Sequence, residues 1–439
     1  MTDWHLIHLG HLALSGAALL TIEATGVMPE GRITYADVGL YDDATEAAIR
    51  RTIGLAYFDM SLFAEAQPQL ERALELRTRV LGAEHPDTLS SMNDLGVLFN
   101  LESKYASAEA LLTKVSEARQ RILGLSHKDT LTTMADLAMA ISYGGDDARA
   151  EPLLIKTLEA ERRAQGEEYR DTVSLMGELA TVKLRLGKFA EAQTHLEKQL
   201  DINRRVLGPD HPNTANTMHN LANAYRLLSK YEQADTMYSA ALQVRLRVRG
   251  EEHWETQHTR FNAGVSYRAQ GRFSEARSLI APAVQALSRL IGAEHPLTLQ
   301  ARYQLAELDR QQHKYAEAES LFNAVLESRR RVLGTDNRDT AQVLMSLGEL
   351  KLEQHAYAEA EKLLREAVEV REKKTPNTWE RYYAQSMLGA SLVGLGRSTE
   401  AEPLLTAGYR GMLERQDSIP AENRVALDAA RQWIAARHE

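Results

Sequence analysis

Cysteine is absent from this 439-residue sequence, so disulfides, thiolate metal sites and cysteine nucleophiles are excluded. Aromatic residues make up only 6% and proline contributes only 11 residues, while alanine, leucine, glutamate and arginine are abundant. This composition favours helices. Basic residues are not in excess either, because the formal net charge is −9, and this balance does not favour non-specific nucleic-acid binding.

Long apolar runs are also missing. The longest, from Leu12 to Val27, is interrupted by Ser15, Thr21 and Glu23 and falls short of the roughly 18–20 residues that a membrane helix needs. The sequence opens without the basic residues of a signal peptide. We therefore expect a cytoplasmic location and no membrane partner.

A repeat of 42 residues occupies most of the chain. A glycine, a threonine six residues later, and an aromatic residue followed by an alanine recur in phase. The glycines are Gly82, Gly124, Gly166, Gly208, Gly250, Gly292 and Gly334; the threonines are Thr88, Thr130, Thr172, Thr214, Thr256, Thr298 and Thr340; the aromatic residues are Phe63, Tyr105, Phe189, Tyr231, Phe273, Tyr315 and Tyr357. Such self-similarity indicates a repeat array rather than one compact core.

Each repeat predicts two helices, which we call helix A and helix B. Gly82 suits the left-handed residue that ends a helix, and Pro86 prevents that helix from continuing. Asp87 or Thr88 is then expected to cap helix A, which runs roughly from 88 to 101. Helix B follows from about 105 to 123. The histidine of this loop, His85 and its equivalents, recurs once per repeat and is interpreted as a residue of the loop structure.

The markers predict an all-α fold, a right-handed superhelical solenoid of about nine helix pairs in residues 44–416. The third pair is irregular, because Asp147 replaces the aromatic residue after the turn at 144–147. A final helix from Pro420 to about Arg437, within a segment of residues 417–439, is expected to cap the last open face.

The motif Gly-Lys-Phe-Ala-Glu-Ala at 187–192, preceded by Leu-Ala at 179–180, resembles a tetratricopeptide repeat. The extension Arg-Arg-Val-Leu-Gly-Pro-Asp-His-Pro-Asn-Thr at 204–214 resembles the longer repeats of kinesin light chains and their bacterial relatives. Residues 401–413, followed by Ile419-Pro420, resemble the ends of bacterial proteins that carry a Ser/Thr kinase domain ahead of such an array. The kinase motifs themselves are absent, so no kinase activity is inferred.

Residues 1–43 carry no repeat marker. Asp3–Gly10, 22–27 and 30–34 resemble a segment of the old yellow enzyme family, flavin-dependent reductases built on a TIM barrel. The resemblance implies a short βα-like fragment, which cannot by itself close an eight-stranded barrel, so we predict no working flavin site and no cofactor. His5, His8 and His11 could suggest a metal, but without a carboxylate or thiolate partner we predict no metal site.

A possible binding face lies on the helices A of the fifth to seventh pairs. Three arginines recur there at steps of 42 residues, beside residues expected to point outward from the same face. The predicted groove residues are Arg226, Arg268, Arg310, His219, Asn223, Phe261, Tyr303 and Gln300, together with Asn93 and Asn100 in the second pair. Arginines would pair with carboxylates of an extended acidic peptide, and the aromatic residues would hold an apolar anchor. Alternatively, the arginines pair with acidic residues of neighbouring helices.

We therefore predict a non-catalytic scaffold that binds another protein or an acidic peptide, with self-association also possible. Two alternatives remain open. The first is a flavin-dependent oxidoreductase, suggested by residues 1–43. The second is a regulatory module of a bacterial kinase or signalling system, suggested by the C-terminal resemblance.

Overall fold

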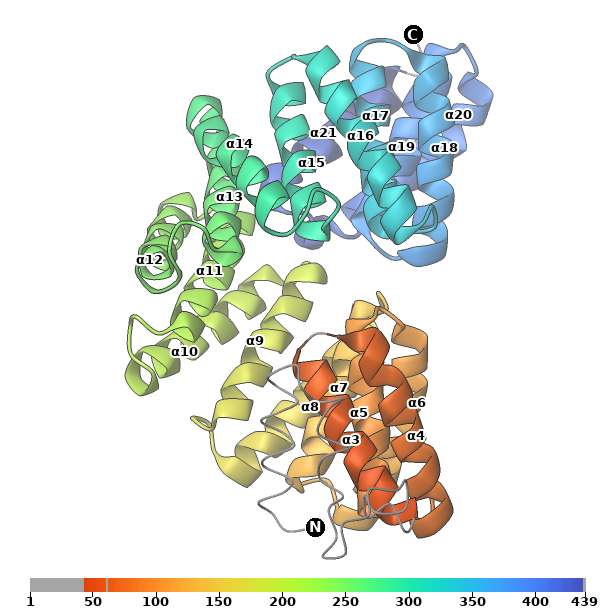
Figure 1. The fold of residues 1–439 in the computed structure, drawn as a ribbon. Helices are drawn as coiled ribbons and strands as arrows, with labels where there is room; N and C mark the ends of the chain where they lie inside the picture. The colour runs from red at the N-terminus through yellow and green to blue at the C-terminus, as the bar shows by residue number, and fades with distance from the viewer. Residues whose placement is uncertain (1–42, 61, 437–439) are drawn as a thin grey trace, which may run out of the picture. The chain divides into compact units, whose positions relative to one another are not determined.

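The computed structural model describes residues 43–60 and 62–436 (Figure 1). The fragment expected in residues 1–43 and its three histidines therefore lie outside the described residues, apart from Asp43. The described residues are helical throughout their regular structure and contain no strand. The helices are α3 (Asp43–Asp59), α4 (Phe63–Leu81), α5 (Pro86–Leu101), α6 (Tyr105–Leu123), α7 (Lys128–Tyr143), α8 (Asp147–Gln165), α9 (Arg170–Arg185), α10 (Phe189–Val206), α11 (Pro212–Leu227), α12 (Tyr231–Arg249), α13 (Trp254–Ala269), α14 (Phe273–Leu290), α15 (Pro296–Gln311), α16 (Tyr315–Leu333), α17 (Arg338–Glu353), α18 (Tyr357–Lys374), α19 (Trp379–Gly394), α20 (Ser398–Leu413) and α21 (Val425–Ala436).

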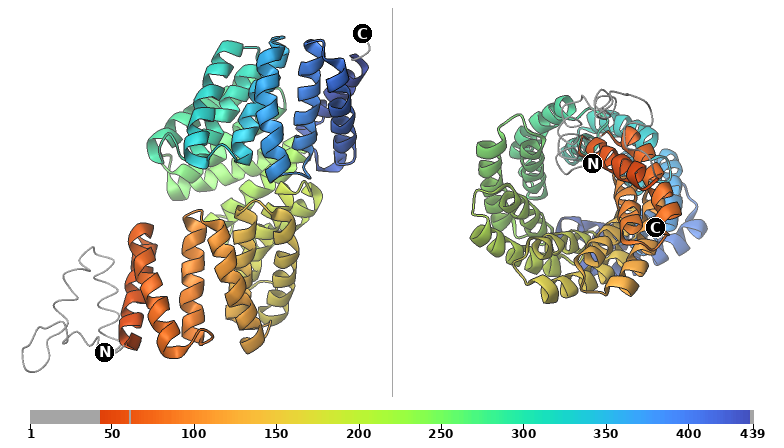
Figure 2. Two further views of the ribbon diagram at one scale, coloured as in Figure 1. Left: turned by 90° about the vertical axis from the view of Figure 1, so that its right-hand side faces the viewer. Right: turned by 60° about the horizontal axis from the view of Figure 1, so that its bottom comes forward.

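The chain divides into two compact units, and the boundary between Glu178 and Leu179 falls inside α9. Unit 1 comprises the described residues up to 178, and unit 2 comprises those from 179 onward. Figure 2 shows the paired helices of each unit from two further sides. The described helices α3 to α20 form the nine consecutive A/B pairs that the 42-residue period predicts, so the all-α fold is confirmed.

Packing within each unit follows the A/B pattern. In unit 2 each of α11, α13, α15 and α17 packs against its own helix B and also contacts the next helix A, whereas α19, the last helix A, packs against α20 and contacts α21. The alanine that follows the aromatic mark is fully buried at Ala66, Ala108, Ala192 and their equivalents. A methyl side chain lets two helices approach closely, which explains why this position stays small. The helices A therefore form a continuous face within each unit, which we call the helix-A face.

The recurring loop has one geometry throughout. The seven glycines from Gly82 to Gly334 all have positive φ, between 84° and 96°. Where the helix ends at the glycine itself, as at Gly82, ψ is 161°, so the residue lies in the region that only glycine adopts and not in the predicted left-handed helical region. The helix therefore ends in an extended glycine, and the chain leaves the helix axis there.

The predicted cap of helix A is wrong by two residues. The N-cap is His85, whose Nδ1 accepts a hydrogen bond from the backbone N–H of Asp87 at 3.2 Å, and helix α5 begins at Pro86. The same contact recurs at His127, His211, His253 and His295. The threonine instead closes the loop, because the Oγ1 of Thr214 donates to the carbonyl of Gly208 at 2.8 Å. A histidine at this position caps because its ring nitrogen reaches the free N–H groups of the first turn.

The C-terminal helix starts later than predicted. Two short 3₁₀ turns, Gln416–Ser418 and Ala421–Asn423, precede α21, which begins at Val425 and not at Pro420. Pro420 has a ψ of 142°, so it lies outside helical geometry and keeps the chain extended between the two turns. Helix α21 packs against α19 and α20 and thus covers the end of the array.

Two features are absent from the described residues, 43–60 and 62–436. None of their helices is long and apolar enough to cross a membrane. No group of three or more histidine, aspartate or glutamate side chains among them is arranged to hold a metal ion.

Candidate functional site

The three arginines of the predicted column lie at equivalent places on the helix-A face of unit 2. Arg226, Arg268 and Arg310 are each the penultimate residue of their helices, α11, α13 and α15. A cation is favoured near a helix C-terminus because the last carbonyl groups carry partial negative charge. The three side chains nevertheless have different surroundings.

Arg310 is surrounded by carboxylates of its own array. It pairs with Glu307 on the same helix at 3.1 Å, with Glu349 on α17 at 3.3 Å, and with Glu353 on α17. Burial alone would lower the pKa of Arg310, but these carboxylates raise it well above its ordinary value. Tyr383 donates to Glu349 at 3.0 Å and completes the group. The alternative interpretation of the column, pairing with neighbouring helices, therefore holds for Arg310.

Arg226 pairs with a residue far away in the sequence. Its Nη1 forms an ion pair with Glu422, which lies 196 residues later in the segment before α21. The two side chains are only 12% and 14% exposed. Burial alone would lower the pKa of Arg226, whereas Glu422 and the hydroxyl of Tyr238 raise it. This contact brings the C-terminal segment onto the helix-A face.

Arg268 lies between the other two and has no such partner. Within residues 43–60 and 62–436 its Nε is buried without a hydrogen-bond acceptor, and no ion pair joins its guanidinium to a carboxylate. Its positive charge does help to lower the pKa of Glu307, against the effect of burial and together with the charge of Arg310. Among the described residues, Arg268 is thus the arginine of the column that forms no ion pair with a carboxylate.

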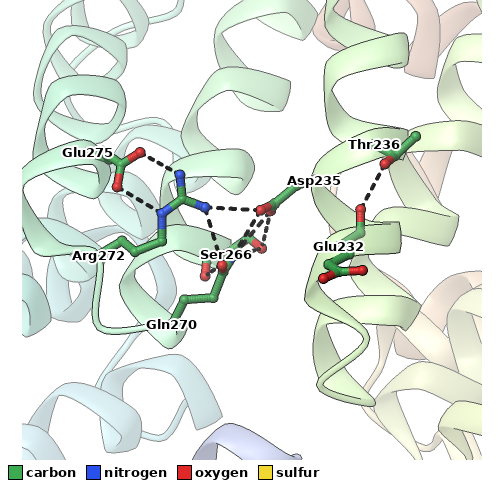
Figure 3. Close-up of polar contacts among 7 residues, drawn as sticks. All are labelled: Glu232, Asp235, Thr236, Ser266, Gln270, Arg272 and Glu275. Atoms are coloured by element: carbon green, nitrogen blue, oxygen red, sulfur yellow. Dashed lines mark hydrogen bonds and ion pairs between the residues drawn. The ribbon is translucent and has the colours of Figure 1, made fainter.

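The carboxylate of Asp235, on α12, is already engaged near the turn that follows Arg268 (Figure 3). It accepts hydrogen bonds from Ser266 at 3.0 Å, from Gln270 at about 3.1–3.2 Å and from Arg272 at 3.3 Å. Arg272 also forms an ion pair with Glu275. Figure 3 shows these side chains converging from α12, α13 and α14. They hold the fifth and sixth pairs together and leave Arg268 outside the network.

A register of 43 residues, one more than the repeat, explains these differences. Several polar contacts between successive helices A join residues separated by 43: Arg51–Asp94, Asn93–Asp136, His219–Asn262, Tyr303–Ser346 and Arg310–Glu353. Arg310 meets a glutamate at this offset. The residues at the same offset from Arg226 and Arg268 are Ala269 and Gln311, which carry no charge. The sequence therefore gives these two arginines no carboxylate at the 43-residue offset on the next helix A.

The aromatic column is not an outward-facing column. His219, Phe261 and Tyr303 are 3%, 2% and 7% exposed, so the expectation that they point outward is wrong. Each packs between successive helices A, which are close enough to bury side chains at this position. Tyr303 shares a hydrogen bond with Ser346 at 3.0 Å, and Phe261 belongs to the core of the sixth and seventh pairs.

His219 lies beside a second histidine. Its ring is 4.6 Å from the ring of His258, and burial lowers the pKa of His219 well below its ordinary value and that of His258 to about 4. Both rings are therefore neutral at pH 7. Asn223 accepts a hydrogen bond from Tyr238 at 2.6 Å, and Gln300 accepts one from Arg329 at 2.7 Å. Asn223 thus lies with Arg226 around Tyr238, whereas Gln300 has a structural partner elsewhere.

Asn93 and Asn100 belong to unit 1, whereas the other predicted groove residues belong to unit 2. Asn93 donates to Asp136 at 3.0 Å, and Asn100 donates to the backbone carbonyl of Asp136 at 3.3 Å. Asp94, Asp136 and Glu178 follow one another at 42-residue steps and form an acidic column that we did not predict. Burial, and then the charge of Asp136, raises the pKa of Glu178 to about 7.

A second set of missed residues lies on helices B. Arg119, Arg245 and Arg329 are buried, and each donates to a backbone carbonyl in the first turn of the following helix A, at 2.7–3.0 Å. Arg119 also donates to Thr133 at 2.7 Å. Their spacing by multiples of 42 residues was available in the sequence, and it marks them as structural residues that join successive pairs.

Comparison with known proteins agrees with this architecture. The tetratricopeptide repeat model matches residues 45–121, 171–247, 221–281, 255–327 and 300–373, which together make up more than half of the chain. The chain belongs to the tetratricopeptide repeat family. The family resemblance of the 187–192 motif is thereby confirmed.

Several solved structures are similar to this chain in fold. The apo form of the quorum sensor NprR from B. thuringiensis is 17% identical, with a TM-score of 0.53, over 84% of this chain and 97% of that chain. A Rap protein complexed with competence and sporulation factor is 13% identical, with a TM-score of 0.51, over 90% and 99%. A putative kinesin light chain from Podosopora anserina is 23% identical, with a TM-score of 0.42, over 47% and 98%. The first two support the tetratricopeptide fold of this chain.

One curated relative belongs to a different class. It is an NADH:flavin oxidoreductase of Gibberella zeae, 45% identical over 56 residues, which are 13% of this chain and 14% of that protein. Its family is the one that residues 1–43 resemble. The chain spans only that small part of the relative's length, so the relative's activity does not transfer to this tetratricopeptide array.

Proposed function

We propose that this tetratricopeptide array is a scaffold that binds an extended acidic peptide of another protein on the helix-A face of unit 2. The observation that carries the proposal is the difference within the arginine column. Arg310 is neutralised by neighbouring glutamates, whereas within the described residues Arg226 and Arg268 form no ion pair with a carboxylate on the next helix A. A peptide that lies along α11 and α13 would supply those carboxylates.

The chemistry of the face suits an acidic ligand. A guanidinium offers a planar set of donors that matches a carboxylate, and it keeps its charge at any physiological pH. Arg226 already holds one carboxylate, that of Glu422. Among proteins of similar fold, the Rap protein was solved in complex with a second molecule, competence and sporulation factor. A tetratricopeptide array of this kind therefore accommodates a bound partner.

The test begins with a random-sequence peptide library displayed to the full chain at neutral pH. We expect the selected peptides to be enriched in aspartate and glutamate. Their affinity, measured by isothermal titration calorimetry, should fall about tenfold or more in Arg268→Glu, because hydrogen bonds to charged groups contribute roughly 1.5–3 kcal/mol. The double variant Arg226→Glu/Arg268→Glu should lose binding altogether.

The matched control is Arg289→Glu. Arg289 lies on helix α14, and its side chain is well exposed and pairs only with Glu252. This variant changes the net charge by the same amount away from the helix-A face. Equal binding by wild type and folded Arg268→Glu, or equal losses in Arg268→Glu and Arg289→Glu, would show that the peptide does not use the column. The role as a regulatory module of a kinase system stays a separate prediction.

A further inference from the structure

The segment between α20 and α21 crosses the helix-A face of unit 2 without belonging to the repeat. It comprises residues 414–424, after the last helix B and before Val425. Its conformation is that of a bound peptide more than of an array element, with two single turns joined by the extended residues Ile419 and Pro420. Three of its residues meet the array at separate points.

The first contact is made by Ser418 with the turn between α9 and α10. A Cβ atom built on Gly187 would lie 2.5 Å from the Cβ and 2.6 Å from the Cα of Ser418. Gly187 also has a φ of +76°. Only glycine combines this conformation with such a close approach, so the turn leaves room for the segment.

The second contact is made by Ile419, which is 1% exposed. It lies in the buried cluster that also contains Tyr303 and Tyr383. Burying an isoleucine side chain contributes roughly 1.5–3 kcal/mol, so this residue anchors the segment. Pro420, which follows Ile419, restricts the backbone of the free segment. The segment therefore loses less conformational entropy when it binds.

The third contact, the ion pair between Glu422 and Arg226, is incompletely satisfied. Within the described residues the Nε of Arg226 and the Oε2 of Glu422 are both buried without a hydrogen-bond partner. A carboxylate that approached Arg226 side-on would engage Nε and one Nη together, the bidentate arrangement that Glu422 does not achieve. A buried pair with such a defect is a weak source of stability, and a better-placed carboxylate can replace it.

We propose that residues 415–424 are an internal ligand, and that partner peptides displace them by presenting the same chemistry in the same order. That chemistry is an apolar residue, a proline, and an acidic residue two positions after the proline, as in Ile419, Pro420 and Glu422. The segment runs from the turn of the fourth pair at Ser418 to the fifth pair at Glu422. A partner that continued toward the sixth pair would place a second acidic residue on Arg268, which the internal segment leaves without a carboxylate.

This inference rests on the proposed function and names both the ligand chemistry and the competitor. The probe is a fluorescein-labelled peptide with the sequence of residues 415–424, titrated with the full chain and followed by fluorescence anisotropy. Glu422→Gln in the protein removes the internal carboxylate but keeps the receptor arginine. The probe should bind Glu422→Gln about tenfold tighter than wild type, because apparent affinity rises with the fraction of open sites.

Three controls accompany the titration. Glu327→Gln changes an exposed glutamate on α16 and should bind the probe as wild type does. A probe carrying glutamine in place of its glutamate should bind Glu422→Gln at least tenfold more weakly. Arg226→Glu should not bind the probe, and its circular dichroism should match that of wild type.

Each other outcome has a distinct meaning. Equal binding by wild type and Glu422→Gln, or equal binding of the two probes, would overturn the internal ligand. If library-selected acidic peptides still bound through Arg268, the proposed function would survive that result. If no acidic peptide bound any folded variant, both proposals would fail. A dimer of Glu422→Gln in light scattering that binds no probe would show exchange of the segment between copies and would also overturn the inference.

Discussion

The helix-A faces of the two units are built on one repeat but carry opposite charges. Unit 1 presents Asp94, Asp136 and Glu178 at 42-residue steps, and unit 2 presents Arg226, Arg268 and Arg310 at another position of the same helices. In unit 1 the acidic residues are held by residues of the unit itself, as Arg51 pairs with Asp94 at 2.5 Å and Asn93 binds Asp136. In unit 2 the 43-residue register brings Glu353 beside Arg310, whereas Arg226 pairs with Glu422, which lies outside the repeat. The 42-residue repeat thus fixes where on helix A a side chain lies. The residue found 43 positions later, on the next helix A, decides whether that side chain meets a charged partner there.

The largest expected effect tests the role of the register in unit 2. Arg310→Ala would leave the buried Glu307 and the partly buried Glu349 without their shared cation, which should lower the free energy of unfolding by about 3–5 kcal/mol. Arg268→Ala is the matched control, since it removes the equivalent side chain but no ion pair, and should change stability by about 0.5 kcal/mol or less. Thermal unfolding followed by circular dichroism measures both. Equal losses in the two variants would show that the register does not govern pairing.

The second prediction concerns the acidic column of unit 1. Because the folded pKa of Glu178 is about 7, above its ordinary 4.5, ionisation of this carboxyl costs stability as the pH rises between these values. Glu178→Gln should therefore stabilise the protein by about 1–3 kcal/mol at pH 8 and by nothing at pH 4. Unfolding midpoints across this pH range measure the difference. Glu65→Gln, an exposed residue of α4, is the control, and a gain for Glu178→Gln that did not depend on pH would contradict the assignment.

The third prediction concerns the histidine that caps helix A, a feature that both units contain. His85→Ala in unit 1 and His211→Ala in unit 2 each remove a ring that caps helix A, so each should cost about 1 kcal/mol. Asparagine should restore most of the loss, because Asn337 already caps α17: its Oδ1 accepts a hydrogen bond from the backbone N–H of Asp339 at 2.8 Å. Unequal costs at the two positions, measured by thermal unfolding, would mean that the loops are not energetically equivalent.

The smallest expected effect is found at the turns inside the pairs. Ser103 in unit 1 and Ser229 in unit 2 have φ values of 61° and 55°, where other pairs have glycine, as at Gly271. Ser103→Gly and Ser229→Gly should relieve steric strain and raise stability by no more than about 1 kcal/mol each. High-precision calorimetry is needed to detect this change. A loss in either variant would mean that the hydrogen bond between the serine and the nearby tyrosine outweighs the strain.

The periodic markers were sufficient to predict the fold, because each marker has a local cause. The glycines of the loops, the small alanines and the aromatic residues act within a few residues or across one helix pair, so their spacing predicted nine pairs. The cap was misplaced since His85 was interpreted only as part of the loop, although its ring satisfies the first N–H groups. The start of α21 was misplaced because Pro420 can either begin a helix or keep the chain extended.

The candidate site was less accessible to sequence reasoning. A column of residues at steps of 42 does not reveal which side chains are buried between helices A, so His219, Phe261 and Tyr303 were expected to point outward. The partner of Arg226 lies 196 residues away in a segment without repeat markers, and no periodicity connects the two. The acidic column of unit 1 was visible in the sequence, but its significance depends on the burial that raises the pKa of Glu178.

The one-residue offset between the repeat and its polar contacts has an evolutionary consequence. A repeat of 42 residues that is duplicated or lost carries its own loop and its own helix pair, yet every 43-residue contact crosses the junction. Moving the seventh pair alone would take Arg310 away from Glu353 and give it a new neighbour. Each rearrangement of such an array therefore changes the ion pairs at the junction, so the charge distribution on the helix-A face can change without a single point substitution.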